Sequence, residues 1–340
     1  MKKVLALVLV AVMLLGLAAC AAKPADPTAT EASKATEATK AETADGKFTI
    51  GICQFMPHPA LDAATKGFKE AVVAELGEAN VTFDEQNAAG EASNCSTIVN
   101  GLVSSKVDLI MANATPAVAA AYNATEEIPI LGTSVTEYGA ALGIKDFSGT
   151  VGANVSGTSD LANLDKQAQM ILDWVPTAKK VALLYCSGEA NSQFQVDKVA
   201  EYLNAKNIET KMFGFADTSD MMAVTQSACD FADVIYVPTD NTVANNATAI
   251  DSIARTAKKP IIAGESGICS GCGIATLSID YYDLGYATGM MAVKILRDGA
   301  DITKMPIEYA PKETALYNEE ICTALGVTPL EGYEKLVVEE

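Results

Sequence analysis

The sequence predicts an α/β protein made of two similar lobes. Short apolar runs that suit parallel strands covered on both faces alternate with segments of helical periodicity. After the first expected strand, apolar residues recur at helical spacing from Leu61 to Leu76. The expected strands cover residues 49–55, 108–112, 128–132, 181–185, 234–237, 260–263 and 274–279. This alternation is typical of βα units.

The two halves of the chain repeat one pattern. Residues 107–119 match residues 232–244 in their order of apolar and polar side chains, and residues 128–134 match residues 259–266. Residues 49–60 match residues 181–191 more loosely. The repeat predicts two lobes that face each other, although βα units also resemble one another by coincidence.

The first twenty residues have the pattern of a bacterial lipoprotein signal. Lys2 and Lys3 precede an apolar run at 4–16, and small residues then lead to Cys20. The run is too short to span a bilayer comfortably, which favours a cleaved signal peptide at 1–19. An ordinary signal or a transmembrane anchor is the alternative. Cys20 would carry the lipid and hold the protein on the extracytoplasmic side of the bacterial cell membrane.

Residues 20–46 are expected to be the lipidated cysteine and a flexible linker. The segment is rich in Ala, Thr, Glu and Lys and has no large apolar residue to bury. A surface helix is the alternative, because Ala, Glu and Lys favour helices. The remaining residues are enough for two domains with hydrophobic cores.

Composition excludes several classes of protein. The 340-residue chain has a formal net charge of −19, which disfavours nucleic acid and anionic lipid as partners. Phosphate-binding, dinucleotide-binding, nucleophile-elbow and zinc-protease motifs are all missing from the sequence. We therefore expect no cofactor, no metal and no catalytic residues.

The cysteines leave two interpretations open. Beyond Cys20 there are seven, and an odd number cannot all pair within one chain. Cys269 and Cys272 form a CxxC that we expect in a loop just before a strand at 273–279. A structural disulfide or two free thiols suits that place better than redox catalysis, which would favour a helix start. Zinc would need further ligands, and the chain has a single histidine.

A candidate binding site follows from the sheet rule. Ligands of open parallel sheets bind beyond the carboxyl ends of the strands, and these ends are unusually polar here. The candidate ligand-binding residues are Gln54, Phe55, His58, Pro59, Ala60, Asn113, Ala114, Thr115, Thr133, Ser134, Val135, Glu189, Asn191, Ser192, Thr239, Asp240, Asn241 and Glu265.

Three of these segments suggest specific roles. The turn from His58 to Ala60 opens a helix, whose free N–H groups attract a ligand carboxylate, unless His58 is only a solvent-facing turn residue. Asp240 or Glu265 would pair with a ligand ammonium, although Asp240 is also well placed as a helix N-cap. Glu189 has the same ambiguity.

Aromatic residues close to strand ends are candidates to sandwich a flat ligand side chain. These are Phe55, Tyr138, Tyr281 and Tyr282, and packing in the core or hinge is the simpler interpretation for the last two.

The segments at 51–64, 184–192, 237–243 and 273–285 together resemble the TrpX-like family of substrate-binding lipoproteins of ABC importers. The resemblance runs from about Lys47 to the C-terminus. It implies a type I periplasmic-binding-protein fold, with two Rossmann-like lobes joined by a three-segment hinge. It also implies a monomer that captures a small amino-acid-like ligand, with tryptophan or tyrosine as examples, and an ABC permease and its ATPase as partners.

Under that fold, the N-terminal lobe would hold residues 47–157 and 284–308, and the C-terminal lobe residues 158–283 and 309–340. Residues 149–157 and 280–285 would be hinge strands. Gly152, Gly157 and Gly285 would absorb the torsional changes of closure.

The sequence thus favours a non-enzymatic binding protein over three alternatives. One is a sensor that presents its ligand to a membrane receptor. The others are an extracytoplasmic thiol-redox enzyme that uses Cys269 and Cys272, and a hydrolase.

Overall fold

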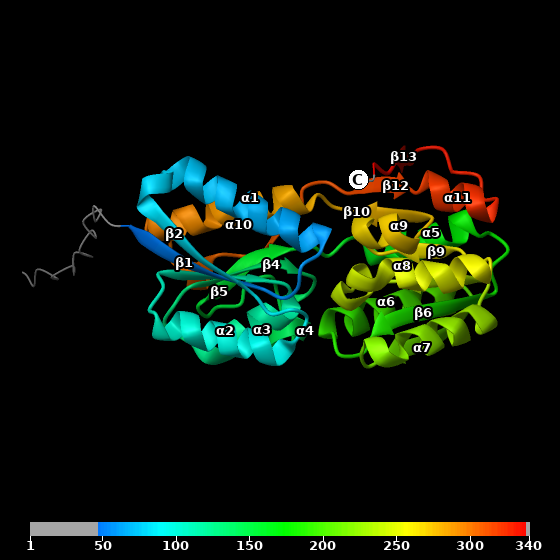
Figure 1. The fold of residues 1–340 in the computed structure, drawn as a ribbon, viewed down its shortest axis with the longest axis horizontal. Helices are drawn as coiled ribbons and strands as arrows, with labels where there is room; N and C mark the ends of the chain where they lie inside the picture. Colours follow the sequence, from blue (N-terminus) through cyan, green and yellow to red (C-terminus); the bar gives the residue numbers. More distant parts are fainter. Residues whose placement is uncertain (1–46, 338–340) are drawn as a thin grey trace, which may run out of the picture. The chain divides into compact units, whose positions relative to one another are not determined.

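The computed structural model describes residues 47–337 and contains two mostly parallel sheets (Figure 1). The first sheet has the strand order β11-β5-β4-β3-β1-β2, and the second has the order β13-β12-β10-β9-β8-β6-β7. All of these strand pairs are parallel except β10 with β12. Each sheet with its covering helices forms one lobe, which confirms the predicted fold class.

The first lobe contains six strands and five α-helices among the described residues. Its strands are β1 (Phe48–Gln54), β2 (Val81–Asn87), β3 (Leu109–Asn113), β4 (Ile130–Val135), β5 (Val155–Ser159) and β11 (Glu308–Tyr309). Its helices are α1 (Pro59–Leu76), α2 (Ala92–Ser104), α3 (Thr115–Ala124), α4 (Tyr138–Leu142) and α10 (Tyr281–Leu296), with 3₁₀ turns at Glu78–Asn80 and Ile302–Lys304.

The second lobe is built in the same way. Its strands are β6 (Lys180–Cys186), β7 (Glu209–Phe215), β8 (Val234–Val237), β9 (Ile261–Ala263), β10 (Ala275–Ser278), β12 (Thr314–Tyr317) and β13 (Glu334–Lys335). Its helices are α5 (Leu164–Trp174), α6 (Ala190–Ala205), α7 (Thr218–Phe231), α8 (Asn241–Thr256), α9 (Ser266–Cys272) and α11 (Glu319–Leu325).

The predicted internal repeat is confirmed by the topology. The order β5-β4-β3-β1-β2 in the first sheet corresponds to β10-β9-β8-β6-β7 in the second. The matched sequence segments at 107–119 and 232–244 become β3–α3 and β8–α8. The carboxyl ends of corresponding strands therefore carry corresponding loops.

Helices cover both faces of each sheet, which explains why the central strands are apolar throughout (Figure 1). In the first lobe, Ile50 and Ile52 of β1 are fully buried in a cluster with Phe68 of α1 and Met291 of α10. Leu102 of α2 belongs to a separate core cluster, against the opposite face of β1 at Gly51. Successive residues of β1 thus serve two different cores.

The chain passes between the sheets three times, after β5, β10 and β11. The first two crossings exchange helices between the lobes. Helix α5 follows β5 and contacts α6 of the second lobe, whereas α10 follows β10 and packs along α1 of the first lobe. These three crossings correspond to the predicted three-segment hinge.

The predicted lobe boundaries fall inside regular elements. The division at 157/158 cuts β5, which stays paired with β11 through Ser159, and the division at 308/309 cuts β11. The division at 283/284 cuts α10, and the predicted hinge strand at 280–285 is wrong. Asp280 accepts a hydrogen bond from the Asp283 N–H (3.0 Å) and so starts α10 there.

Gly285 packs two helices together and is not a hinge residue. A Cβ built on Gly285 would lie 1.9 Å from the Ala64 carbonyl oxygen of α1, and one on Gly67 would lie 2.2 Å from the Tyr282 carbonyl oxygen of α10. The two helix backbones approach so closely that only glycine fits at these positions.

Two further details differ from the sequence prediction. The CxxC at Cys269–Cys272 lies in α9 and not in a loop, because Glu265 caps the start of that helix. The strands β2 and β7 were not predicted, since both lie at sheet edges and carry mixed polar and apolar residues.

The predicted signal peptide at 1–19, lipidated Cys20 and linker at 20–46 lie outside the described residues. From residue 47 to residue 337, we find no helix with the length and apolarity needed to cross a membrane.

Candidate functional site

A cavity lies between the two lobes, at the carboxyl ends of strands from both sheets. We call it the central cavity; its volume is about 10 Å³, room for about one water molecule. That volume is far below the usual range for ligand pockets, so a bound amino acid requires the lobes to lie further apart than they do here. Its lining comes from both lobes and from two of the crossings, and consists of His58, Leu61, Ser134, Thr136, Asp160, Asn191, Thr239, Asp240, Asn241, Ala244, Glu265 and Tyr281.

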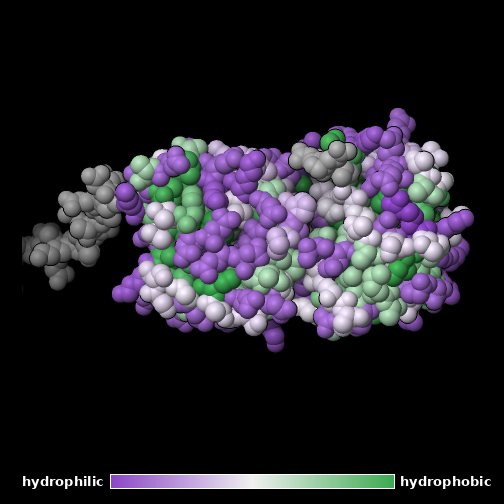
Figure 2. Space-filling view, in the orientation of Figure 1, coloured by the Kyte–Doolittle hydropathy of each residue, from purple (hydrophilic) through white to green (hydrophobic). Residues whose placement is uncertain are grey.

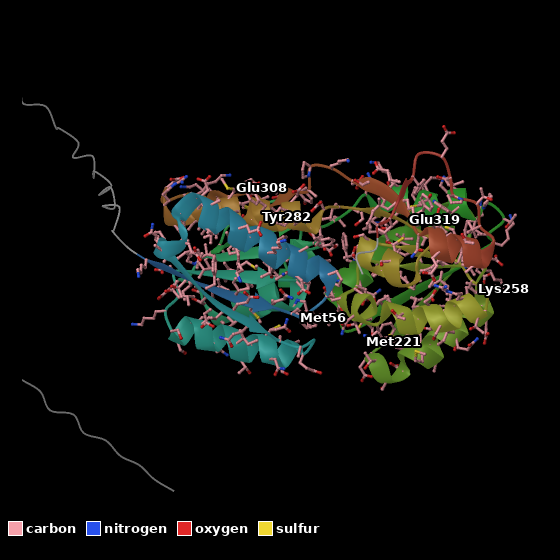
Figure 3. The ribbon with its side chains drawn as sticks, turned by 45° about the horizontal axis from the view of Figure 1, so that its top comes forward. Met56, Met221, Lys258, Tyr282, Glu308 and Glu319 are labelled. Atoms are coloured by element: carbon pink, nitrogen blue, oxygen red, sulfur yellow. The ribbon has the colours of Figure 1, made fainter. Side chains whose placement is uncertain are left out.

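A second, more open groove runs beside the central cavity, and we call it the lateral groove. It is lined from the first lobe by Phe55, Met56 and Thr115 and from the second by Glu189 and Thr242, among others. Figure 3 shows Met56 just after β1, on the side of the first lobe that faces the second. Hydrophilic side chains cover most of the face seen in Figure 2, and apolar residues occur in small separate areas.

One hydrogen bond of the central cavity joins the two lobes. His58 Nε2 lies 3.2 Å from Asn241 Oδ1. The amide group of Asn241 donates to Glu189 Oε2 (2.7 Å), so its Oδ1 is the acceptor and the His58 ring N–H is the donor. His58 is therefore buried between the lobes and is not a solvent-facing turn residue.

The acidic residues predicted to hold a ligand ammonium mainly cap helices. Asp240 accepts from the Val243 N–H (2.9 Å) at the start of α8 and from the Cys186 N–H (2.7 Å). Glu265 accepts from the Gly267 N–H (2.6 Å) and the Ile268 N–H at the start of α9. Their oxygens are thus already hydrogen-bonded to backbone amides.

Glu189 has the same structural role at α8. It accepts from the N–H groups of Asn241 (3.1 Å) and Thr242 (2.9 Å). Burial, with the nearby Glu189 charge, raises the pKa of Asp240 to about 7. Burial also raises the pKa of Glu265, an effect that the nearby His58 and the backbone hydrogen bonds from Gly267 and Ile268 oppose.

Asp160 is the acidic residue of the cavity with a free oxygen. It directly follows β5 on the first crossing and is 4% exposed. Asp160 Oδ2 accepts from the Tyr281 hydroxyl (3.0 Å), but Oδ1 is buried with no hydrogen-bond partner in the described part of the chain. Burial raises the pKa of Asp160 to about 6, against the opposing hydrogen bond from Tyr281. A buried, ionised carboxylate with one unpartnered oxygen favours the binding of a cationic group from a ligand.

Two more buried acceptors in the cavity lack partners. Asn191 Oδ1, in the first turn of α6, and Ser134 Oγ, near the end of β4, have none among residues 47–337. Ser134 also has a left-handed backbone (φ 54°), which is uncommon for a serine and is typical of functional positions. Three unpartnered polar atoms thus lie on one cavity, where buried polar atoms are normally satisfied.

Hydrogen-bond donors reach the cavity from the start of α1. Pro59 is the first residue of this helix, and no side chain of the described residues caps it. The N–H groups of Ala60 and Leu61 lie in the first turn, where no carbonyl of the helix can accept from them. Leu61 lines the central cavity, whereas Ala60 lines a separate groove, and an anionic ligand group at this helix start stays a prediction.

Eight of the twelve residues around the cavity were candidates from the sequence: His58, Ser134, Asn191, Thr239, Asp240, Asn241, Glu265 and the aromatic Tyr281. Asp160 was missed, because the predicted hinge strand at 149–157 ends before it and β5 itself is polar. The internal repeat could have indicated it, since β5 corresponds to β10 and its carboxyl end belongs with the others. Leu61 and Ala244 were missed as ordinary helix residues.

The remaining candidates lie elsewhere. Phe55, Thr115 and Glu189 line the lateral groove, and Pro59 and Ala60 line a separate groove beside α9. The other six are buried away from the central cavity: Gln54, Asn113, Ala114, Thr133, Val135 and Ser192.

Hydrogen bonds within the lobes explain the position of two of these six. The Gln54 amide donates to the Met56 carbonyl (2.9 Å) and Asp62 Oδ1 (2.7 Å). The Asn113 amide donates to the Leu61 carbonyl (2.8 Å). Both side chains hold the start of α1 against the sheet.

Among the predicted aromatic residues, only Tyr281 reaches the central cavity. Tyr138 is buried in the first lobe, where it stacks on Phe147 with ring centroids 6.4 Å apart. Tyr282 lies over α1 and donates to Glu70 (2.6 Å), as its place in Figure 3 indicates.

The two cysteines of the CxxC are not in a setting that favours reactive thiolates. All seven in the described range are free and buried. Burial raises the pKa values of Cys269 and Cys272, so the reactive thiolate is disfavoured at both. Within residues 47–337, no group of three or more His, Cys, Asp and Glu side chains is arranged to hold a metal ion.

Known proteins with similar sequences and structures agree with this geometry. The chain is 36% identical over 283 residues to a tyrosine-binding protein of Clostridioides difficile, a match that covers 83% of this chain and 81% of that protein. A solved ABC domain from Streptococcus pneumoniae in complex with L-Trp has 29% identity and a TM-score of 0.81, and covers 86% of this chain and all of that one.

A second solved structure is also similar to this chain. It is the ligand-free, open structure of a substrate-binding protein with adhesive properties from Clostridium difficile. It is 36% identical to this chain, compared with 29% for the L-Trp complex, and its TM-score is 0.66, compared with 0.81. Both matches cover 86% of this chain and all of the other chain.

A family model described as "ABC transporter substrate binding protein" matches residues 49–338. The chain therefore belongs to the family of ABC transporter substrate-binding proteins.

Proposed function

We propose that this protein captures an amino acid in the central cavity and delivers it to an ABC permease with its ATPase. Its work would take place outside the cytoplasm, where lipid on Cys20 would anchor it to the bacterial cell membrane. The pattern of residues 1–20 supports the anchor, and the relatives named for tyrosine and bound to L-Trp support the ligand class.

The observation that carries the proposal is the buried, unpartnered oxygen of Asp160. A ligand ammonium placed there would complete the hydrogen bonding of this carboxylate. The resulting charge-assisted contact would be strong because the cavity excludes water.

The same cavity also offers partners for a carboxylate. The Ser134 hydroxyl can donate a hydrogen bond, and Leu61, in the first turn of α1, lines this cavity, so its N–H group is a second candidate donor. Groups of both kinds in one small space fit the ammonium and carboxylate of a zwitterion. A sugar would leave Asp160 without a cation.

Binding would also join the lobes. Asp160 lies on a crossing, Ser134 on the first lobe and Asn191 on the second, so a ligand that contacts all three stabilises the closed arrangement. His58 and Asn241 add a direct contact between the lobes. An importer can recognise such a closed form, and so can a membrane receptor if the protein is a sensor.

A thermal-shift screen of the full chain against the twenty amino acids tests the proposal. We expect one or a few amino acids to raise the unfolding temperature, with the ligand recovered unchanged from the sample. Absence of any shift, or chemical conversion of the ligand, would contradict capture and favour one of the enzymatic alternatives.

A further inference from the structure

We infer that Asn191 selects an amino acid whose side chain carries a hydrogen-bond donor, as tyrosine and tryptophan do and phenylalanine does not. This inference rests on the proposed function and assigns a specificity-determining residue to it. It follows from the free oxygen of a buried amide whose orientation is determined by its neighbours.

The orientation of the Asn191 amide follows from its contacts. Asn191 is 3% exposed, and its Nδ2 donates to the Thr239 carbonyl (3.1 Å) and to Glu189 Oε2 (3.2 Å). A carbonyl and a carboxylate only accept hydrogen bonds, so a flipped amide would place oxygen against oxygen. Nδ2 must therefore face these acceptors, and Oδ1 is left as a buried acceptor without a partner among the described residues.

A hydrogen-bond donor from water or from the ligand has to satisfy Asn191 Oδ1. The ammonium and carboxylate of the ligand already have other partners in the proposed site. Asp160 is the charged acceptor for the ammonium and sits beside Tyr281 on the crossings. Asn191 lies in α6, beside Glu189, which lines the lateral groove. Asn191 Oδ1, the neutral acceptor, and the Asp160 carboxylate, the charged acceptor, thus lie on different elements around the cavity.

Apolar contacts lie in the same cavity. Leu61 of α1 and Ala244 of α8 line it, and can contact the apolar body of a ligand side chain. A side chain with an apolar body and an O–H or N–H group would therefore match both kinds of lining. Phenylalanine would fill the same space and leave Asn191 Oδ1 unsatisfied.

The expected discrimination is about 10- to 100-fold in affinity. A buried acceptor left without a partner costs about 1–3 kcal/mol, and 1.4 kcal/mol corresponds to a factor of ten. Sites built to bond a substrate hydroxyl reject the analogue without it more strongly than a purely apolar pocket rejects a shape variant.

Titration calorimetry of the full chain with L-tyrosine, L-tryptophan, L-phenylalanine and O-methyl-L-tyrosine tests the inference. We expect tyrosine or tryptophan to bind at least about tenfold more tightly than phenylalanine. For a tyrosine ligand, O-methyl-L-tyrosine should lose the same advantage, because it keeps the oxygen and lacks the donor.

The variant Asn191→Leu removes the acceptor and keeps a side chain of similar size. We expect its preference for the donor-bearing ligand over phenylalanine to fall to within about threefold, while phenylalanine affinity is kept or improved. Asn204→Leu, an exposed position of the same helix, is the matched control and should keep the wild-type preference.

Two results would overturn the inference. In one, the wild-type protein binds phenylalanine as tightly as tyrosine and tryptophan. In the other, Asn191→Leu weakens all ligands equally, which would mean that Asn191 contacts the ammonium. Both leave amino-acid capture intact, whereas failure of every amino acid to bind would refute the proposed function itself. If Asn191→Leu does not fold, the wild-type comparison decides alone.

Discussion

At the scale of single residues, the site depends on which carboxylates are already satisfied. Asp240, Glu265 and Glu189 each accept backbone N–H bonds at helix starts. Asp160 retains a free buried oxygen. Sequence analysis ranked the capping residues as candidates because chemistry alone does not show which acid is free.

Replacement of Asp160 by asparagine should therefore separate binding from folding. We expect Asp160→Asn to weaken amino-acid binding by at least about 30-fold, since loss of one partner of a buried charge pair costs about 2–5 kcal/mol. The free protein should be as stable as the wild type or more so, because a buried charge is removed. Calorimetry and thermal unfolding measure the two effects.

The control for this variant is Asp165→Asn, an exposed acid in the first turn of α5. It should bind like the wild type. Equal affinities of Asp160→Asn and the wild type would show that Asp160 does not contact the ligand.

The raised pKa of Asp160 predicts how binding depends on pH. With a pKa of about 6 in the free protein, Asp160 is ionised at pH 8 and protonated at pH 5. A ligand ammonium favours the ionised form, so the dissociation constant should rise by up to about tenfold per pH unit below 6. Calorimetry from pH 5 to pH 8 measures this slope, which Asp160→Asn should reduce to the part that comes from Asp240, whose pKa is about 7.

The stability of the free protein should depend on pH in the opposite direction and fall as the pH rises. A pKa raised from 3.8 to about 6 on folding stabilises the folded state below pH 4, and this contribution is lost as the pH rises through 6. Its size is about 3 kcal/mol. From pH 4 to pH 7, the unfolding free energy of the wild type should therefore fall relative to that of Asp160→Asn. A constant difference would contradict a buried, titrating Asp160.

At the scale of elements, the apolar central strands and the long periodic helix at 59–76 were predicted from sequence within a few residues. Polar or mixed strands were not. Strand β5 reads Val-Ser-Gly-Thr-Ser and is nevertheless fully buried, because its side chains hydrogen-bond to neighbouring segments. Such pairing is set by tertiary contacts and leaves no periodic signal in the chain.

The contact between α1 and α10 gives a prediction at this scale. Gly285→Ala should destabilise the protein by about 1–3 kcal/mol or more, because the new methyl group meets the Ala64 backbone and neither helix can retreat easily. Gly101→Ala is the matched control. Gly101 is exposed in α2, where an added Cβ meets nothing within 4 Å of the described atoms.

Denaturant unfolding compares the two variants. We expect Gly101→Ala to stabilise the protein by about 0.5–1 kcal/mol, as alanine favours a helix over glycine. If Gly285→Ala had the same effect as Gly101→Ala, the close packing of α1 and α10 would be refuted.

At the scale of the whole molecule, the repeat in the sequence predicted two facing lobes, and the topology confirms them. The exchange of α5 and α10 between lobes was expected only from the family resemblance, which placed most of α10 in the N-terminal lobe and α5 in the C-terminal lobe, since a helix by itself does not reveal which sheet it covers. That exchange places Asp160 and Tyr281 on neighbouring crossings, where they meet at 3.0 Å.

The burial of all seven described cysteines predicts a uniform response to thiol reagents. In the native protein, 5,5′-dithiobis-(2-nitrobenzoic acid) should react slowly with these seven thiols, and all seven should react after denaturation. Two thiols that react rapidly in the native state, mapped to Cys269 and Cys272, would revive the redox alternative.

The central claim is that an amino acid is held between the lobes by its ammonium group. A crystal structure of the protein grown with L-tyrosine tests it most directly. We expect the ligand in the central cavity, with its ammonium within hydrogen-bond distance of Asp160 Oδ1 and its carboxylate at the start of α1. A ligand bound elsewhere on the protein, or one turned so that its carboxylate faces Asp160, would contradict the claim.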